Sequence, residues 1–337
     1  MVTTAQVQTA PGVLKRIQDS AFVERVYTSL HQGIQGLIYR VSPVVAAQRR
    51  YQLKMGRRLR LENPLTFDEK LFWLMLFWHH PLKAQCADKL GMRAHAENLG
   101  YGHLLVDLLG VYTRVSDIDF PALPDRFVLK CSHGCGFNIL CPDKRALEEQ
   151  AVRRRLRAWM RRDYAKIHGE SQYEGLVPRI LCERFLDDGS GGPPADFKLH
   201  CFHGKVYFTT VCTGRDLDGQ GAAYDHYDRE WLHQLPYSKF GSHPDRWRAR
   251  PDCYQDMVQA AEALSAPFPY VRMDFYSIAG RPLLGEMTFT PSGCIDIGYT
   301  DEAQDGLGAL IHLPEPLARW AGAAGAAAPT SAGAPGR

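Results

Sequence analysis

The stretch VRMDFYSIAGRPLLGEMTFTPSG, residues 271–293, limits the possible folds more than any other part of the chain. It has the pattern of two strands joined by a turn at Gly280 and followed by a loop of Pro, Ser and Gly. Acidic side chains stand inside the strands, at Asp274 and Glu286. Acids are poor strand formers and are costly to bury alone. Their placement therefore requires either a solvated surface or a partner.

The spacing of these acids predicts that they lie close together. Residues two apart on a strand share a face, so Arg272 points with Asp274, and Glu286 points with Thr288. If the strands pair about the Gly280 turn, the carboxylates converge. Convergent carboxylates suit Mg²⁺, which takes hard oxygen ligands and bridges polyphosphate oxygens. A surface ladder of salt bridges remains the alternative for this motif taken alone.

A second motif, VLKCSHGCGFNIL, is predicted to form a strand that ends at Lys130, a turn with Gly134 and Gly136, and another strand. Glycines let backbone N–H groups approach a phosphate closely, and a lysine adds positive charge. The stretch is not a P-loop, because no Gly-Lys-Ser/Thr follows. A phosphate site and a plain hairpin both remain open.

The same stretch holds Cys131, His133, Cys135 and Cys141, which also allows a zinc interpretation. Zinc requires four ligands at regular spacing, and no second Cys/His pair with zinc-finger spacing stands nearby. Free thiols are the preferred interpretation.

The rest of the chain mixes helices with hairpins, which favours an α+β fold with α/β layers. Thr66 and Glu69 form a capping-box pattern before an apolar helix, and a hairpin is expected to turn at Gly204. Five regions are expected: a helical basic N-terminal extension, a substrate-side region, two parts with the Gly turn and the paired acids, and a disordered tail, at residues 1–60, 61–125, 126–187, 188–318 and 319–337.

The extension ends in the basic run RRYQLKMGRRLR. A solvated helix face explains this run, and so does contact with an anionic glycan or a membrane surface.

Composition bears on the binding partners and the cellular compartment of the protein. The net charge of +3 excludes little, and we expect no nucleic-acid partner. Nine cysteines without a regular framework, and no secretory signal, indicate a cytoplasmic protein with reduced thiols. The longest bulky apolar run, residues 71–78, is far shorter than the roughly 20 residues of a membrane span and is predicted to be a buried helix.

Taken in order, these motifs resemble the ATP-grasp superfamily. The Arg-x-Asp at 272–274 followed by Glu-x-Thr at 286–288 is similar to the metal motif of D-alanine–D-alanine ligases. The chain resembles the TupA-like (teichuronopeptide-biosynthesis) branch more closely, through TFDEKL, ADKLGMR, LPDRFVLKCSHGCGFNI, DFKLHCFHGK and the opening stretch. The resemblance covers residues 66 to about 310. It implies an ATP-grasp fold, in which two α+β subdomains clasp ATP, with Mg²⁺ as the metal.

The resemblance also implies roles for individual residues. By this resemblance, Lys89 and Lys130 contact the ATP phosphates. The lid over the phosphates is the loop 132–138, with Ser132, His133, Gly134, Cys135, Gly136 and Asn138. The adenine pocket involves Glu183, Phe185 and Leu186, and Asp196 lies near the ribose. The γ-phosphate or an acyl-phosphate is contacted by Lys198 and Arg215, and the reacting carboxylate by Arg272. The Mg²⁺ ligands are Asp274, Glu286 and Thr288.

The chain departs from the family pattern at two of these positions. Thr288 replaces an Asn that is common in the superfamily, and Cys135 replaces a Ser that is frequent in the branch. A hydroxyl can ligate Mg²⁺, and the lid acts mainly through backbone N–H groups. No general base is identified, because His200 and His203 are expected to be surface residues.

The implied activity is an ATP-dependent carboxylate–amine ligase that forms an amide through an acyl-phosphate. The expected substrates are a uronic-acid-like carboxylate of a cell-surface polysaccharide and an amino acid or amine. The alternatives are an amino-acid or peptide ligase of a natural-product pathway, a non-catalytic nucleotide-binding regulator, and a carbohydrate kinase.

Overall fold

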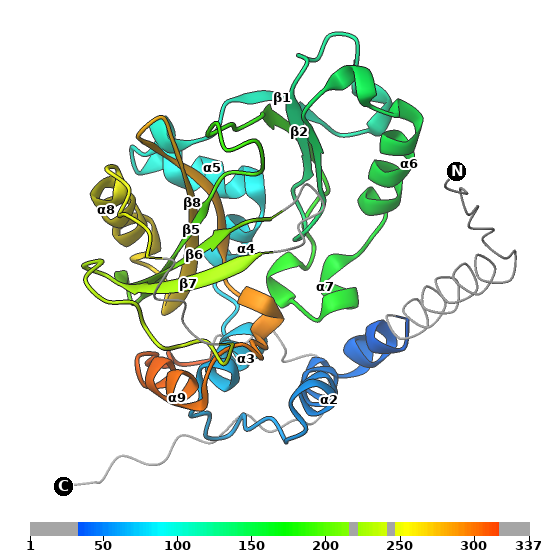
Figure 1. The fold of residues 1–337 in the computed structure, drawn as a ribbon. Helices are drawn as coiled ribbons and strands as arrows, with labels where there is room; N and C mark the ends of the chain where they lie inside the picture. Colours follow the sequence, from blue (N-terminus) through cyan, green and yellow to red (C-terminus); the bar gives the residue numbers. More distant parts are fainter. Residues whose placement is uncertain (1–32, 216–221, 241–246, 317–337) are drawn as a thin grey trace, which may run out of the picture.

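The computed structural model describes residues 33–215, 222–240 and 247–316 of the chain. Its core consists of two antiparallel sheets with helices around them (Figure 1). The α+β class expected from the sequence is therefore confirmed. The predicted disordered tail at 319–337, and residues 1–32 of the predicted extension, lie outside the described residues.

The described N-terminal part is helical. A helix covers residues 33–41, and four more follow: α2 (Pro43–Met55), α3 (Phe67–Phe77), α4 (Pro81–Ala87) and α5 (Lys89–Asn98). The basic run is only partly helical, because Gly56 adopts a left-handed conformation that ends α2 at Met55. Asp88 separates α4 from α5 and caps the start of α5 with its carboxylate.

Helix α3 forms as the sequence predicts. The Thr66 hydroxyl accepts a hydrogen bond from the Glu69 N–H, and the Glu69 carboxylate accepts one from the Thr66 N–H, which completes the capping box. Apolar residues on all sides of α3 are buried, so the run at 71–78 lies in the core. Its start contacts α9 (Asp301–Ala309), where a Cβ on Gly308 would lie 2.2 Å from the Leu65 carbonyl oxygen.

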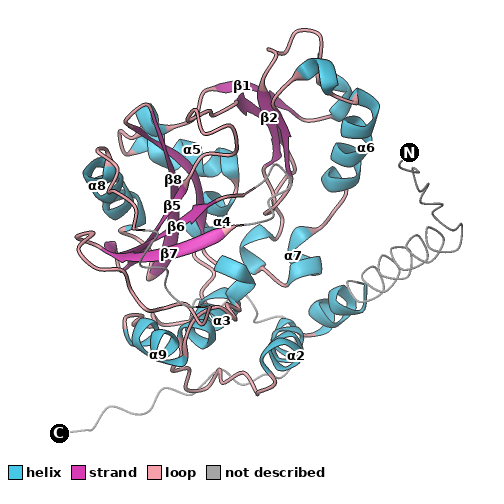
Figure 2. Ribbon diagram, viewed as in Figure 1, coloured by secondary structure: helices cyan, strands magenta, loops and turns pink. Residues whose placement is uncertain are grey.

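The smaller sheet has the order β1-β4-β2-β3. Its strands are β1 (Leu108–Tyr112), β2 (Phe127–Cys131), β3 (Asn138–Cys141) and β4 (Ile180–Arg184). Beside it lie α6 (Glu149–Met160) and α7 (Tyr164–His168) (Figure 2). The basic helix α6 buries Val152, Leu156 and Trp159 in the core of this sheet. The charged residues of α6 lie on its opposite side.

The larger sheet has the order β7-β6-β5-β8-β9. Its strands are β5 (Asp196–Phe202), β6 (Lys205–Thr213), β7 (Ala223–Asp228), β8 (Tyr270–Ile278) and β9 (Arg281–Thr288). Helix α8 (Tyr254–Ser265) packs on its apolar face, where Leu199 and Cys201 share a core with Ala261 and Leu264. The other face carries the polar residues that alternate with these along the strands.

Tight turns close two hairpins of this sheet. His203 and Gly204 have φ of 49° and 74°, and Ala279 and Gly280 have φ of 49° and 73°. Two consecutive residues with positive φ match a type I′ turn, whose twist suits an antiparallel pair. The turns predicted at Gly204 and Gly280 are thus confirmed.

A β-bulge lies between this second turn and the paired acids. Phe275 pairs with Leu284, whereas Asp274 pairs with Glu286, so Gly285 is the extra residue. A Cβ on Gly285 would lie 2.9 Å from the Tyr276 ring, which leaves little room for a side chain there.

Short 3₁₀ turns complete the chain, at η1 (Gly102–Leu104), η2 (Val115–Asp117), η3 (Lys144–Ala146), η4 (Ser171–Tyr173) and η6 (Pro291–Cys294). None of the helices in the described ranges combines the length and the apolar composition that crossing a bilayer requires.

Candidate functional site

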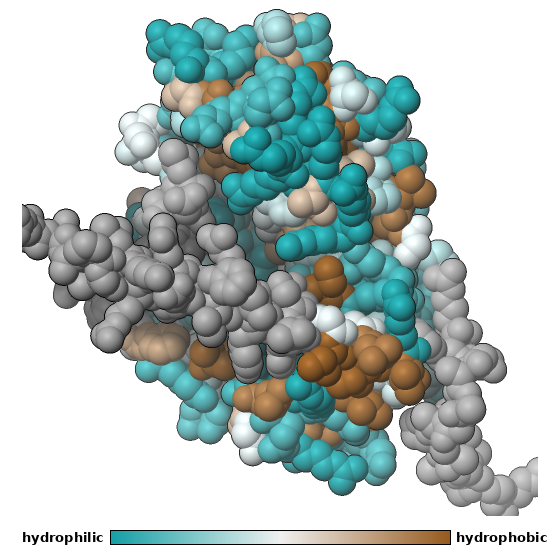
Figure 3. Space-filling model, turned by 90° about the vertical axis from the view of Figure 1, so that its right-hand side faces the viewer, coloured by the Kyte–Doolittle hydropathy of each residue, from teal (hydrophilic) through white to brown (hydrophobic). Residues whose placement is uncertain are grey.

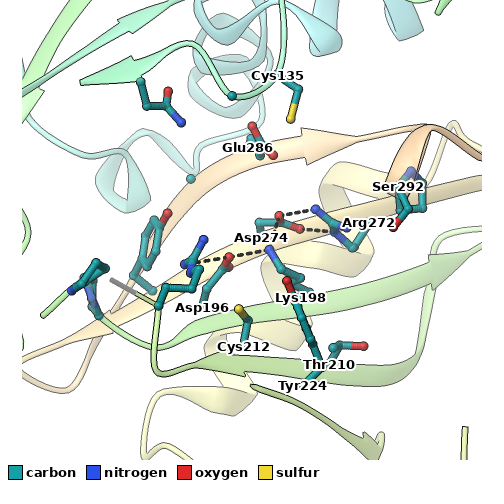
Figure 4. Close-up of a pocket in the computed structure, with 18 of the residues that line it drawn as sticks. Cys135, Asp196, Lys198, Thr210, Cys212, Tyr224, Arg272, Asp274, Glu286 and Ser292 are labelled. Carbon is teal, nitrogen blue, oxygen red and sulfur yellow. Dashed lines mark hydrogen bonds and ion pairs between the residues drawn. The ribbon is translucent and has the colours of Figure 1, made fainter. Parts of the chain in front are cut away.

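A cavity of about 790 Å³ lies between the two sheets. Its wall on the smaller sheet includes Lys130 and Glu183, and its wall on the larger sheet includes Lys198 and Asp274. The volume falls in the range typical of cofactor pockets. Figure 4 shows the polar side chains that line it.

One row of side chains crosses all five strands of the larger sheet. Glu286 on β9 is opposite Asp274 on β8, Asp274 is opposite Lys198 on β5, Lys198 is opposite Thr210 on β6, and Thr210 is opposite His226 on β7. All five residues line the cavity. The predicted convergence of the two acids is therefore confirmed, and it forms one end of a longer polar row.

Asp274 is buried and ion-paired. Its oxygens accept hydrogen bonds from Nε and Nη2 of Arg272, both at 2.6 Å, and one from Lys198 Nζ at 2.8 Å (Figure 4). Burial raises the pKa of Asp274, but the charges of Arg272 and Lys198 outweigh it and hold the pKa below its usual range. Asp274 is thus a carboxylate with fixed geometry on a rigid strand.

Lys198 lies between two carboxylates. Its Nζ contacts Asp274 and also Asp196, which accepts a further hydrogen bond from Arg215 at 3.2 Å. Burial raises the pKa of Asp196, although Lys198 opposes this shift. Asp196 Oδ1 is buried and has no hydrogen-bond partner among the residues that the structure describes. Such an atom is ready to accept a hydrogen bond from a ligand.

Glu286 is less enclosed than Asp274. Its side chain is 32% exposed, and Lys89 Nζ lies 3.9 Å from its Oε2. Thr288 donates to Glu286 Oε1 at 3.2 Å and accepts from Arg272 at 3.3 Å, and it is not among the cavity-lining residues. In this arrangement the threonine hydroxyl orients Glu286 and Arg272.

The oxygen donors of Asp274 and Glu286 fit Mg²⁺. Among the described residues, no three Asp, Glu, His or Cys side chains converge on one point. This agrees with the usual binding of Mg²⁺ by one or two carboxylates plus phosphates of a substrate, without an all-protein cage. The same finding removes the zinc alternative, since Cys131, Cys135 and Cys141 are free thiols within the described chain.

The predicted phosphate residues separate into two groups. Lys89, Lys130, Cys135, Gly136 and Asn138 line the cavity. Lys89 Nζ donates to the carbonyl oxygen of Gly134 at 2.8 Å and so fixes the Gly turn.

The other group faces away from the cavity. Ser132 is fully buried, and His133 is buried with its Nε2 at 3.2 Å from the Trp159 carbonyl oxygen. Neither side chain reaches the cavity, and Gly134 does not line it.

The predicted adenine residues Glu183, Phe185 and Leu186 also line the cavity. Glu183 forms an ion pair with Lys130 at 2.6 Å, and the guanidinium of Arg126 lies 4.4 Å from the Phe185 ring centre. A flat apolar and aromatic wall next to charged groups suits a nucleobase.

The expectation that His200 is a surface residue is wrong. His200 is buried, and its Nδ1 lies 2.9 Å from the Tyr270 hydroxyl, while its Nε2 lies 3.1 Å from Thr210 Oγ1. Thr210 Oγ1 is also 2.8 Å from His226 Nδ1. Burial lowers the pKa of His226 to about 4 and that of His200 well below its usual value, so both are neutral at pH 7. His203, in contrast, is exposed as expected.

Sequence reasoning missed this hydrogen-bonded chain, although a signal existed. Asp196, Lys198 and His200 alternate along one predicted strand, so His200 had to share the face of two residues already assigned to the site. Arg155 of α6 also lines the cavity, although none of the sequence motifs contains it.

A loop in an unusual conformation borders the cavity after β9. Ser292, Gly293 and Cys294 have φ of 51°, 61° and 66°, and Ser292 lines the cavity. Arg50 of α2 donates to the carbonyl oxygens of Gly293 and His168 and so holds this loop. Left-handed non-glycine residues are costly and often occur at functional sites.

The chemical capacity of the site follows from these contacts. Lysines and arginines surround two carboxylates that can bind Mg²⁺, within a cavity large enough for a nucleotide and a second ligand. Phosphoryl transfer requires charge neutralisation and positioning more than covalent help, and this arrangement provides both.

The family described as TupA-like ATP-grasp matches residues 69–312. Among solved structures, D-alanine–D-alanine ligase from Bacillus anthracis, complexed with ATP, is 13% identical, with 67% of this chain and 64% of that chain covered and a TM-score of 0.42. L-amino acid ligase from Bacillus licheniformis is 16% identical, with 74% and 55% covered and a TM-score of 0.42. D-cycloserine synthetase is 15% identical, with 68% and 71% covered and a TM-score of 0.40.

The chain thus spans less than two thirds of the length of the first two of these structures. A search of curated proteins found no relative that matches. The family match nevertheless covers most of the chain and includes both sheets and the whole polar row. The expected ATP-grasp fold is thereby confirmed, and the chain belongs to the TupA-like ATP-grasp family.

Proposed function

We propose that this ATP-grasp enzyme joins a carboxylate to an amine, with ATP as the phosphoryl donor and Mg²⁺ as the metal. The observation that carries the proposal is the cross-strand row, in which Asp274 and Glu286 stand opposite each other and Lys198 adjoins them inside the cavity. Carboxylates, a buried lysine and Arg272 at one point are the groups that acyl-phosphate formation needs.

In the first step, a carboxylate oxygen of the substrate attacks the γ-phosphorus, the bond to the β-phosphate oxygen breaks, and ADP leaves. Lys198 and Arg215 neutralise the transferred phosphoryl group in this proposal, and Lys89 and Lys130 contact the other phosphates. Asp274 and Glu286 would hold Mg²⁺, which supplies charge neutralisation across the phosphate oxygens. Thr288 keeps Glu286 in place through its 3.2 Å hydrogen bond, whether or not it also ligates the metal.

In the second step, the amine attacks the carbonyl carbon of the acyl-phosphate, the C–N bond forms, and phosphate leaves as the amine loses a proton. Arg272, in this assignment, stabilises the oxyanion of the tetrahedral intermediate. One such donor contributes roughly 3 kcal/mol. The loop 132–138 excludes water, which otherwise hydrolyses the acyl-phosphate.

For the substrates, we propose a uronic-acid-like carboxylate of a cell-surface polysaccharide or its precursor, and an amino acid or simple amine. The family resemblance supports this choice. Exposed basic residues of α6, such as Arg154 and Arg157, would suit an anionic saccharide. We place the reaction on the cytoplasmic side, where ATP is supplied.

The proposal is tested by phosphate and ADP release from a panel of carboxylate and amine pairs. We expect turnover that needs both a uronic acid and an amine, and that falls by about a hundredfold or more in Asp274→Ala and in Glu286→Ala. Asp256→Ala, an exposed acid on α8, is the matched control and should keep full activity.

Other outcomes separate the alternatives. Turnover with free amino acids only would replace the saccharide substrate by a peptide-ligase activity. A stable phosphorylated product without an amine requirement would indicate a kinase. Nucleotide binding without any turnover would indicate a regulator.

A further inference from the structure

The first described helix and α2 expose an apolar stripe. Ile34, Leu37, Val41 and Val45 are 50%, 64%, 74% and 50% exposed. Their steps of three and four residues place the first three on one side of the helix at 33–41. Figure 3 views the side of the molecule toward which this helix projects in Figure 1, and an apolar area stands out there among hydrophilic surroundings.

This stripe is separate from the side of the helix that holds it to the protein. Gln35 is buried and donates to the Ala46 carbonyl oxygen at 3.0 Å, and Tyr39 is buried and donates to Glu174 at 2.9 Å. The inner side of the helix thus makes polar contacts to the protein, while Ile34, Leu37 and Val41 remain exposed. An ordinary surface helix instead turns its apolar stripe toward the core.

The charged residues of this segment of the chain have one sign. Between Gly33 and Leu61 the sequence contains no Asp or Glu. It contains seven cations, namely Arg40, Arg49, Arg50, Lys54, Arg57, Arg58 and Arg60. Arg49 and Arg50 are half-buried and bonded within the protein, whereas Arg40, Lys54 and Arg58 are exposed.

The combination of apolar residues and cations indicates which kind of partner binds the stripe. A second copy of the chain would bring the same positive charges against each other at a symmetric contact. A dissolved polyanion would use the cations but would leave Leu37 and Val41 in water. An anionic lipid surface satisfies both, since its headgroups attract the cations and its acyl boundary accepts the apolar side chains.

We propose that the stripe and its exposed cations form a docking surface for an anionic lipid bilayer, on which the protein lies without crossing it. The inference does not depend on the proposed reaction.

Cosedimentation of the full-length protein with vesicles tests this proposal. The vesicles contain phosphatidylcholine with about 30 mol% phosphatidylglycerol, and phosphatidylcholine alone is the reference. We expect binding to the anionic vesicles only, weakened by salt because exposed charges are screened. The double variant Leu37→Asp/Val41→Asp should lower the bound fraction by about tenfold, since it removes apolar contact and adds repulsion.

The matched control is Leu232→Asp, which changes a residue that is 67% exposed in the turn after β7. It should bind vesicles as the wild type does. All variants should keep the wild-type circular dichroism, because the changed side chains are exposed.

Three results would overturn the proposal. They are equal binding to neutral and anionic vesicles, a dimer in light scattering that Leu37→Asp/Val41→Asp dissociates, and binding of polygalacturonate by a protein that does not bind vesicles.

Discussion

Replacing Lys198 by methionine tests the charge arrangement on which the site depends. Lys198 contacts Asp196 and Asp274, and all three side chains are buried or nearly so. Removing one partner of a buried ion pair costs about 3–5 kcal/mol, because the other charge is left uncompensated. Asp274 keeps Arg272, and Asp196 keeps Arg215 at 3.2 Å. We therefore expect the free energy of unfolding of Lys198→Met to be about 3 kcal/mol lower than that of the wild type at pH 8, which is the lower end of that range.

The loss should depend on pH in a defined direction. In the wild type, Lys198 lowers the pKa of both Asp196 and Asp274 against the effect of burial. Without it, both folded-state pKa values rise; burial then dominates at Asp196, whereas Arg272 still opposes the effect of burial at Asp274. A carboxyl with a folded pKa above its unfolded pKa loses stability as pH rises between the two values. The difference in free energy of unfolding between the wild type and Lys198→Met should therefore become smaller as the pH falls. The change should be about 1.4 kcal/mol per pH unit for each carboxyl that becomes protonated.

Urea unfolding of wild type and variant at about pH 8 and about pH 5.5 measures this difference. Lys205→Met is the control, since Lys205 is 76% exposed on the neighbouring strand and pairs with Glu262 at the surface. It should cost under about 1 kcal/mol at either pH. A deficit of Lys198→Met that is the same at both pH values would mean that lost packing, and not charge, is responsible.

The remaining predictions concern the helices that support the site. Thr66→Ala removes the hydroxyl half of the capping box, so thermal unfolding should show a loss of about 1 kcal/mol. Gly308→Ala should cost about 2 kcal/mol or more by urea unfolding, because its Cβ would lie 2.2 Å from the Leu65 carbonyl oxygen. Gly306→Ala lies two residues earlier on the same helix, and nothing in the described part of the chain lies within 4 Å of its Cβ. It should instead be stabilising by about 0.5–1 kcal/mol. Equal effects at the two glycines would contradict the close contact between α9 and the start of α3.

The paired acids show how far the sequence predicted the site. The turn at Gly280 and the alternation of residues predicted that the acids share a face, and they do. A regular hairpin with this turn, however, would pair Asp274 with Gly285 and point Glu286 toward the core. The bulge at Gly285 restores the register, and no pattern of apolar and polar residues reveals a bulge in advance.

The cavity shows a second limit of what the sequence can predict about the site. Strand patterns assign residues to faces, so Asp196 and Lys198 could be placed on the face of the acids. They do not tell which part of a face is covered, and His200 is buried through its contacts with Tyr270 and Thr210. Similarly, Ser132 and His133 were predicted in the lid with their neighbours, whereas both are buried, His133 beside the Trp159 carbonyl oxygen of α6.

The ion pairs around Asp274 bear on the order in which ligands arrive. Arg272, Lys198 and Arg215 already act as counter-ions to the carboxylates, so the site offers little attraction to a bare divalent cation. A cation that enters together with a polyphosphate brings compensating negative charge, for which the same lysine and arginines become partners. We therefore expect the nucleotide and its metal to bind as one complex. Until they bind, the side-chain cations of the protein compensate the negative charge of the carboxylates.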